Sequence, residues 1–188
     1  GLLLIIEKKG YNNFLDELND AISTITPSVM LNKKIHKSFE TDKYSALNQK
    51  GVKIEAVSRH EITGDNLAMP TLASVNAASF FRNSSLSDEI FGPYSLIVKC
   101  KNENELEDIV GTLEGQLTAT IFAADKENED YGSIINQLKN RVGRIIFNGV
   151  PTGVEVCGSM QHGGPYPASG DVRFTSVGTS AIKRFTRP

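Results

Sequence analysis

Residues 94–148 alternate between strand-like and helix-like patterns, and this alternation constrains the fold more than any other feature of the sequence. Runs rich in β-branched and aromatic residues are typical of strands, and the apolar residues between them recur at helical spacing. The predicted elements are a strand at 95–100, a helix from Asn102 or Asn104, a strand at 117–124, a helix at about 127–140 and a strand at 144–147. Strands that alternate with helices form βαβ units, so we predict an α/β fold with a largely parallel sheet flanked by helices.

The N-terminal part of the chain predicts further strands and helices. Five apolar residues form a helical stripe and predict an amphipathic helix over 11–25: Phe14, Leu15, Leu18, Ile22 and Ile25. Asn32 suits an N-cap and Gly51 suits a left-handed residue at a helix end, so a second helix is expected over 33–49. The other expected elements are a buried strand at 2–7, a strand at 52–57, a polar loop at 65–70, a strand at 71–75, a helical turn at 77–81 and a short helix at 179–185.

The chain has room for one full-sized domain. Its 188 residues can bury a substantial core, and no linker separates two apolar regions. We therefore expect a single domain over residues 1–188.

Charge and cysteine usage exclude several classes of protein. A formal charge of −2 leaves no excess of Lys and Arg to neutralise phosphates, so we expect no nucleic-acid partner. No apolar stretch reaches membrane-spanning length, so we expect no membrane partner. Two cysteines cannot form a secreted disulfide framework, which indicates a reducing cytoplasm. The three histidines and two cysteines show no metal-ligand spacing, so no metal site is predicted.

Residues 88–93 read D-E-I-F-G-P and lead into the strand at 95–100. A Gly-Pro step turns the backbone, which places Glu89 and Phe91 in a loop or short helix at a strand end. A carboxylate beside an aromatic ring suits a ligand with hydroxyls and a flat face, such as a nucleoside. A surface acid beside a buried Phe is the alternative interpretation.

A glycine-rich stretch follows Asn148, and long loops of this kind are often functional. Cys157 lies five positions before His162, so a Cys/His nucleophile pair is one hypothesis, and a loop thiol without a catalytic role is the other. Cys100 lies in the middle of a predicted strand, where a small buried side chain is expected. The paired glycines Gly163 and Gly164 allow close backbone approach, either to a ligand or in a turn that docks the loop on the sheet.

Three segments in this order resemble the C-terminal half of the aldehyde dehydrogenase superfamily. They are residues 88–93 (D-E-I-F-G-P), 143–149 (G-R-I-I-F-N-G) and 162–170 (H-G-G-P-Y-P-A-S-G). The corresponding family elements are E-x-F-G-P, G-x-x-x-x-N and F-G-G-x-x-x-S-G. Residues 150–156 and 173–178 resemble the branch that contains α-ketoglutaric semialdehyde dehydrogenase and the NADP-dependent fatty aldehyde dehydrogenases. The resemblance covers essentially the whole chain and implies the three-layer sandwich of that C-terminal domain.

The resemblance implies oxidation of an aldehyde to a carboxylic acid with NAD or NADP, through a thioester on a cysteine. Glu89 matches the glutamate that accepts hydrogen bonds from the nicotinamide ribose, and Phe91 matches the aromatic residue beside it. His162 stands where most relatives have Phe, and an imidazole there suits a polar substrate tail. Thr152 and Val154 match a loop that lines the substrate channel.

No catalytic residue is assigned within this chain. In the family pattern the nucleophilic cysteine lies just before the segment that Gly1 begins, and neither Cys100 nor Cys157 aligns with it. The general base and the dinucleotide-binding domain also lie upstream, so we expect the isolated chain to be inactive. The full-length protein is expected to be a homo-oligomer that acts on a small-molecule aldehyde. The alternatives are a non-catalytic binding or scaffold module and an unrelated hydrolase that uses Cys157.

Overall fold

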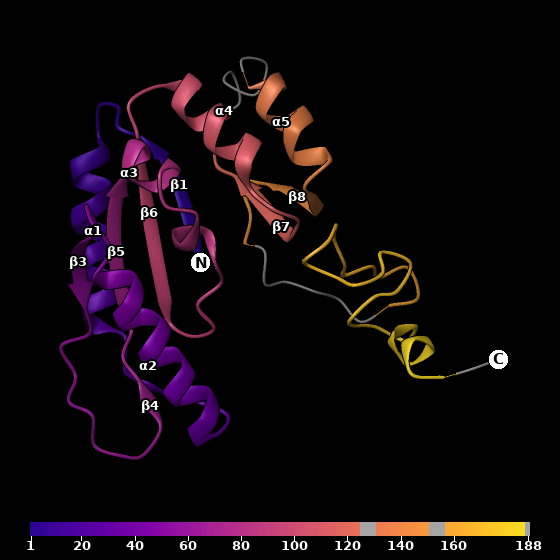
Figure 1. The fold of residues 1–188 in the computed structure, drawn as a ribbon, viewed down its shortest axis with the longest axis horizontal. Helices are drawn as coiled ribbons and strands as arrows, with labels where there is room; N and C mark the ends of the chain where they lie inside the picture. Colours follow the sequence, from indigo (N-terminus) through magenta and orange to yellow (C-terminus); the bar gives the residue numbers. More distant parts are fainter. Residues whose placement is uncertain (125–130, 151–156, 187–188) are drawn as a thin grey trace. The chain divides into compact units, whose positions relative to one another are not determined.

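The computed structural model describes residues 1–124, 131–150 and 157–186. The chain divides into two compact units, Gly1–Ile109 and Val110–Pro188 (Figure 1). The expectation of one domain over 1–188 stays a prediction.

The first unit is built on a four-stranded sheet with the order β1-β6-β5-β3. Its strands are β1 (Leu2–Ile6), β3 (Lys53–Val57), β5 (Thr71–Asn76) and β6 (Tyr94–Cys100). The strands β1, β6 and β5 are parallel, and β3 joins β5 antiparallel at the edge. The predicted α/β fold with a largely parallel sheet is therefore confirmed, with β3 as its antiparallel exception.

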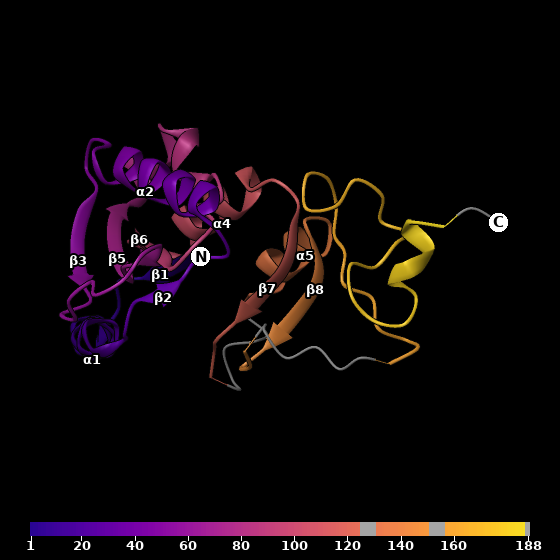
Figure 2. The same cartoon turned by 90° about the horizontal axis from the view of Figure 1, so that it is seen from below.

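The central strands carry apolar side chains on both faces because both faces are covered. Helix α1 (Tyr11–Thr24) and helix α2 (Lys33–Leu47) lie on opposite sides of this sheet (Figure 2). On the α1 side, the core consists of the strand residues Ala56, Leu72 and Ile97. Three residues of the predicted stripe pack against it: Leu15, Leu18 and Ile22. The other two stripe residues, Phe14 and Ile25, are exposed.

The predicted start of α2 is confirmed, because the Asn32 side chain accepts a hydrogen bond from Ile35 N at 3.0 Å. This bond satisfies a backbone group that the start of a helix otherwise leaves without a partner. The helix ends at Leu47 with Asn48 as its C-cap, earlier than expected. Gly51 has the expected left-handed φ of +90°, but it lies in the turn that follows and does not cap the helix.

The expected polar loop at 65–70 is only partly correct, because it contains strand β4 (Leu67–Ala68). This short strand pairs antiparallel with β2 (Ser28–Val29), and Met30 N donates to Asn66 O at 2.9 Å. The pairing joins segments far apart in the sequence, so the local composition of the loop does not reveal it.

Asparagine side chains begin the remaining helices of the first unit. Asn76 caps α3 (Ala77–Phe81) and Asn83 caps the 3₁₀ helix η1 (Ser84–Ser87). Asn102 accepts from Glu105 N at 3.0 Å at the start of α4 (Glu103–Thr112), as the sequence predicts. These short polar side chains replace the missing carbonyl partners of the first helical turn.

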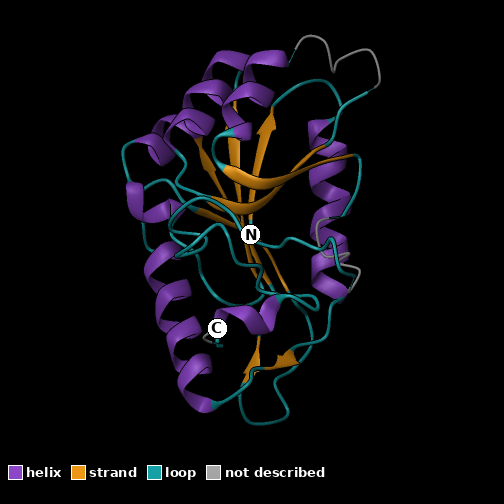
Figure 3. Ribbon diagram, turned by 90° about the vertical axis from the view of Figure 1, so that its right-hand side faces the viewer, coloured by secondary structure: helices purple, strands orange, loops and turns teal. Residues whose placement is uncertain are grey.

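The second unit contains a parallel pair of strands, β7 (Gln116–Ile121) and β8 (Val142–Phe147), and helix α5 (Gly132–Lys139). The predicted strand at 117–124 ends at Ile121, and part of the predicted helix at 127–140 lies outside the described residues. The expected short helix at 179–185 is the 3₁₀ helix η2 (Ala181–Arg184). Most of the described chain after β8 is loop (Figure 3).

In the part of the chain that the structure describes, no helix has the length and apolar character needed to cross a membrane.

Candidate functional site

The loop at 88–93 lies at the amino ends of three parallel strands. Thr71 N, at the start of β5, donates to Pro93 O at 2.9 Å. The nitrogen of Gly1, just before β1, donates to Tyr94 O at 2.6 Å, and Leu96 N donates to Gly1 O at 2.9 Å. The loop is thus tied to the sheet by backbone hydrogen bonds at its C-terminal end.

Glu89 and Phe91 both expose their side chains from this loop, and the ring of Phe91 is 67% exposed. The Glu89 carboxylate lies within electrostatic reach of the nitrogen of Gly1, the residue that precedes β1. The expected placement of both residues in a loop at a strand end is confirmed, and Phe91 is not the buried residue of the alternative interpretation.

Gly92 is the one position of this loop that admits no side chain. A Cβ atom built on Gly92 would lie 2.3 Å from Cδ2 of Phe39, and the φ of Gly92 is +158°. Phe39 belongs to α2 and is 1% exposed. The Gly-Pro turn of the motif therefore depends on close packing between the loop and this ring.

A shallow pocket lies beside the loop, at the amino edge of the sheet. Its lining includes Gly1, Ile22, Thr71, Gly92 and Tyr94. The Tyr94 hydroxyl is buried without a hydrogen-bond partner among the described residues, and burial raises its pKa to about 12.

In the second unit, the turn at Gly163 and Gly164 packs directly on the strand backbones. A Cβ on Gly143, in β8, would meet Gly163 O, and a Cβ on Gly164 would lie 2.3 Å from Gln116 O in β7. The paired glycines thus dock the loop on the two strands, which is one of the two interpretations that the sequence left open.

His162 is fixed through its backbone. Its N–H donates to Thr175 Oγ1 at 2.8 Å, and its carbonyl accepts from Ser176 N at 3.0 Å and from Ser176 Oγ at 2.9 Å. These bonds, the ones that His162 forms within the described part of the chain, do not use the imidazole. The other two expected substrate residues, Thr152 and Val154, lie outside the described residues.

The two cysteines occupy opposite environments. Cys100 is fully buried, and burial together with Glu105 and Glu7 raises its pKa to about 11, so its expected role as a small buried side chain is confirmed. The sulfur of Cys157 lies 3.4 Å from Ser159 Oγ, and this hydrogen bond lowers its pKa. Among the described residues, the sulfur's hydrogen bond goes to Ser159 and not to His162. The described residues also contain no group of three or more His, Cys, Asp or Glu placed to hold a metal ion.

Sequence comparison gives relatives along the whole chain. An alpha-ketoglutaric semialdehyde dehydrogenase from Acinetobacter baylyi is 38% identical over 190 residues, covering 100% of this chain and 36% of the relative. Alpha-ketoglutaric semialdehyde dehydrogenase 2 from Azospirillum brasilense is 36% identical over 188 residues, with the same coverage. This chain belongs to the aldehyde dehydrogenase superfamily. No protein-family model matches it. The chain spans about a third of the length of these curated relatives.

Solved structures show the same fold at lower identity. The delta-pyrroline-5-carboxylate dehydrogenase of Mycobacterium tuberculosis matches with a TM-score of 0.76 and 17% identity, over 100% of this chain and 35% of the other. Its NAD-bound structure matches with a TM-score of 0.72 and 16% identity, over 100% of this chain and 34% of the other. A succinic semialdehyde dehydrogenase from Streptococcus pyogenes in complex with NADP⁺ matches with a TM-score of 0.67 and 18% identity. This match covers 87% of this chain and 35% of the other. The aldehyde dehydrogenase fold expected from the motifs is therefore confirmed.

Proposed function

We propose that this chain forms part of an NAD(P)-dependent aldehyde dehydrogenase that oxidises an aldehyde to a carboxylic acid through a cysteine thioester. The observation that carries this proposal is the 38% identity to an alpha-ketoglutaric semialdehyde dehydrogenase along the whole chain. The exposure of Glu89 and Phe91 at the amino edge of the sheet supports it, because it leaves the carboxylate and the ring of the E-x-F-G-P element accessible to a ligand.

The loop at 88–93 fits a nicotinamide ribose. An ionised carboxylate only accepts hydrogen bonds, and a ribose offers two hydroxyl donors, so Glu89 can bind both. The exposed ring of Phe91 offers an apolar face of the size of the sugar or the nicotinamide. When bound, the nicotinamide supplies the acceptor for the hydride of the aldehyde. The neighbours solved with NAD and with NADP⁺ support either cofactor.

The contribution of this chain is positioning. Hydride transfer depends steeply on the distance and direction between the reacting carbons, so a rigid ribose site raises its rate. Hydrogen bonds from Thr71 to Pro93 and from Gly1 to Tyr94 hold the loop to the start of the sheet. Glu89 therefore presents its carboxylate beside the residue that, in the family pattern, follows the nucleophilic cysteine.

The substrate side of the site rests on His162, Thr152 and Val154. The backbone of His162 is held by Thr175 and Ser176, which leaves the imidazole free to donate a hydrogen bond to a polar tail. The names of the two curated relatives favour a carboxylated semialdehyde, 2,5-dioxovalerate, over a fatty aldehyde. The proposal includes a homo-oligomeric full-length protein and an isolated chain without activity.

The test is an assay of the protein encoded by the complete reading frame, with NAD and NADP and with 2,5-dioxovalerate and a fatty aldehyde. Glu89→Gln keeps the shape of the side chain but loses the charge, so kcat is expected to fall by about 10- to 100-fold. The exposed neighbour Asp88 supplies the matched control, and Asp88→Asn is expected to keep the wild-type kcat. Absence of NAD(P)-dependent aldehyde oxidation by the complete protein would refute the proposal. Normal turnover by residues 1–188 alone would refute its claim that the isolated chain is inactive.

A further inference from the structure

We propose that Phe39 is a positioning residue for the loop at 88–93, and that it sets the place of Glu89 and Phe91 by packing against Gly92. The inference rests on the proposed function, because its consequence is measured on the nicotinamide cofactor. Phe39 lies in α2, far from the loop in the sequence, and belongs to none of the motifs that identify the family.

The contact between ring and loop is close. A Cβ atom on Gly92 would lie 2.3 Å from Cδ2, 2.6 Å from Cε2 and 2.9 Å from Cγ of Phe39. Real Cβ atoms do not approach other heavy atoms this closely, so the ring fills the volume that a side chain would need. The backbone of the loop thus rests on the edge of the aromatic ring, and the ring limits how far the loop can move toward α2.

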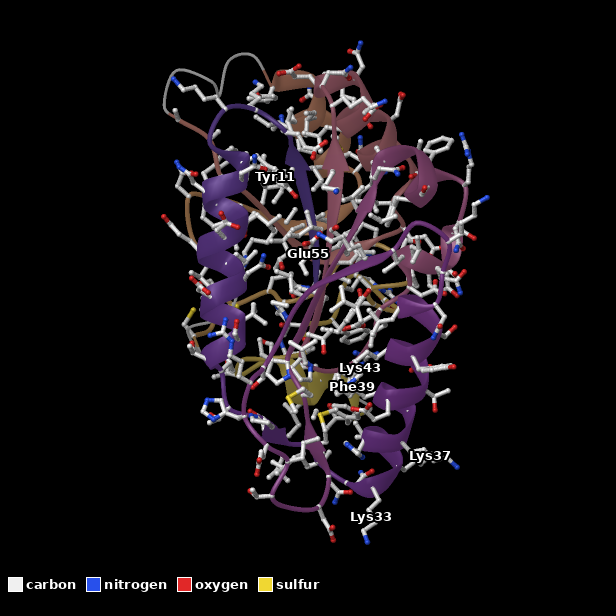
Figure 4. All side chains as sticks on the ribbon, turned by 90° about the vertical axis from the view of Figure 1, so that its left-hand side faces the viewer. Tyr11, Lys33, Lys37, Phe39, Lys43 and Glu55 are labelled. Atoms are coloured by element: carbon white, nitrogen blue, oxygen red, sulfur yellow. The ribbon has the colours of Figure 1, made fainter. Side chains whose placement is uncertain are left out.

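The ring itself is held on several sides. It is 1% exposed, and Lys43, one helical turn further along α2, places Nζ 4.6 Å from the ring centroid (Figure 4). A Lys ammonium over an aromatic face is attractive, and Glu40 keeps the ammonium in place with a 2.8 Å ion pair. His36, on the same helix, forms a 3.1 Å hydrogen bond with the carbonyl of Leu67 in β4. These contacts make α2 a fixed support for the loop.

Among the described residues, the backbone bonds that hold the loop to the sheet lie at its C-terminal end. Tyr94 N donates to Gly92 O at 2.8 Å, and Pro93 O accepts from Thr71 N. Glu89 and Phe91 lie before these bonds and expose their side chains. The Phe39 contact at Gly92 therefore acts on the segment that carries the two ribose-binding residues. Without the ring, Gly92 can move into the vacated volume and take both residues with it.

The first test uses Phe39→Ala and the milder Phe39→Leu in the protein encoded by the complete reading frame. We expect the Kd for NAD(P)H to rise and kcat to fall by about 10- to 100-fold in Phe39→Ala, since displacements near 1 Å have effects of this size. A primary deuterium isotope effect on kcat, measured with aldehyde deuterated at C1, is expected to increase because hydride transfer becomes slower. Phe39→Leu keeps part of the volume and is expected to show the same changes to a smaller extent.

Phe80→Ala is the matched control. Phe80 is also buried, at 4% exposed, and lies in α3 after the carboxyl end of β5, whereas Gly92 precedes the amino end of β6. Its truncation removes the same side-chain volume from the same unit. We expect Phe80→Ala to lower Tm as Phe39→Ala does, but to leave the isotope effect at its wild-type value.

A double-mutant cycle tests the contact itself. In the wild-type background, the new methyl group of Gly92→Ala clashes with Phe39, and alanine must also adopt a φ that is unfavourable for it. In the Phe39→Ala background only the unfavourable φ remains. The factor by which Gly92→Ala lowers kcat/KM for NAD(P) is therefore expected to be at least about ten times smaller in that background than in the wild type.

The outcomes separate this inference from the proposed function. If the wild-type protein is active and Glu89→Gln impairs it, but both Phe39 variants keep the wild-type Kd and isotope effect, the positioning role is wrong and the function stands. Additive effects of Phe39→Ala and Gly92→Ala would also overturn it. If Phe39→Ala fails to fold, the same readings on Phe39→Leu decide the matter. A wild-type protein that neither binds NAD(P)H nor oxidises an aldehyde would overturn both proposals.

Discussion

The side chain of Asn148 binds the backbone of Ala123 through two hydrogen bonds. Its Oδ1 accepts from Ala123 N at 3.0 Å and its Nδ2 donates to Ala123 O at 2.9 Å. A third bond, from Asn148 N to Ile121 O at 2.9 Å, joins the same segments through the backbone. Asn148 has a φ of +49°, which asparagine tolerates better than most residues. The Asn of the family's G-x-x-x-x-N element thus extends the pairing of β7 and β8 beyond the last strand residue.

We expect Asn148→Ala to destabilise the protein by about 1–2 kcal/mol, because it removes two hydrogen bonds at an exposed site and places alanine at a positive φ. Asn148→Gly removes the same hydrogen bonds, but glycine adopts a positive φ without strain, so the loss of stability is expected to be smaller. Urea unfolding of both variants measures the difference. A more stable Asn148→Ala than Asn148→Gly would contradict this explanation.

Gly143 is expected to tolerate no side chain. A Cβ atom there would collide with the carbonyl oxygen of Gly163, and the obstacle is backbone, which no rotamer change can move. We expect Gly143→Ala to cost about 3 kcal/mol or more, the upper end of the range for overpacking, as measured by the denaturation midpoint. Gly170→Ala is the control, because nothing lies within 4 Å of its Cβ position. Equal stability of the two variants would contradict the docking of the glycine turn.

Local patterns in the sequence predicted most of the fold. Helical spacing identified α1, and the residue type of Asn32 identified the start of α2, because these features depend on neighbours within a few residues. The pairing of β2 with β4 was missed because it depends on contacts between distant segments. Contacts of this kind leave no periodicity in the sequence.

In the candidate site too, features set by local residues were predicted and a contact between distant segments was not. The motif at 88–93 predicted that Glu89 and Phe91 lie in a loop at a strand end, since a Gly-Pro step is a local signal. The role of Phe39 beneath Gly92 was missed, because nothing in the sequence around an apolar helix residue says which distant turn it contacts. The glycine of the Gly-Pro turn was the available hint of a close partner, because glycine permits close approach as well as a turn.

Cysteine chemistry is expected to differ sharply between the two thiols. At pH 8, a thiol with a pKa of about 11 is ionised in only about one molecule in a thousand, and Cys100 is also fully buried. The hydrogen bond from Ser159 lowers the pKa of Cys157, which raises its thiolate fraction. Peptide mass spectrometry of the native protein is expected to show rapid reaction of a disulfide reagent at Cys157 and slow reaction at Cys100. Labelling of Cys100 as fast as that of Cys157 under native conditions would show that this assignment is wrong.

Glu55 is a buried carboxylate whose partners are expected to make stability depend on acid pH. Its side chain is 4% exposed, accepts a 2.6 Å hydrogen bond from Ser74 Oγ and pairs with Lys53 Nζ at 2.9 Å. Burial alone raises the pKa of Glu55, but the hydrogen bonds from Lys53 and Ser74 outweigh burial and lower it. A depressed carboxyl pKa contributes stability above the pKa of the unfolded chain, and this contribution is lost as the pH falls through the folded value.

We therefore expect Glu55→Gln to be less stable than the wild type by about 1–3 kcal/mol at neutral pH, the range for hydrogen bonds to a charged group. The exposed ammonium of Lys53 adds little to that difference because water screens it. The difference is expected to shrink as the pH falls below about 4.3, the ordinary value for Glu, and to vanish below the folded pKa. Ser74→Ala removes one donor and brings the folded pKa of Glu55 closer to the unfolded value, so its loss of stability in acid is expected to be smaller and to be complete at a higher pH. Free energies of unfolding between pH 2 and 7 that fall in parallel for the wild type and Glu55→Gln would contradict this account, because they would assign the acid sensitivity to other carboxylates.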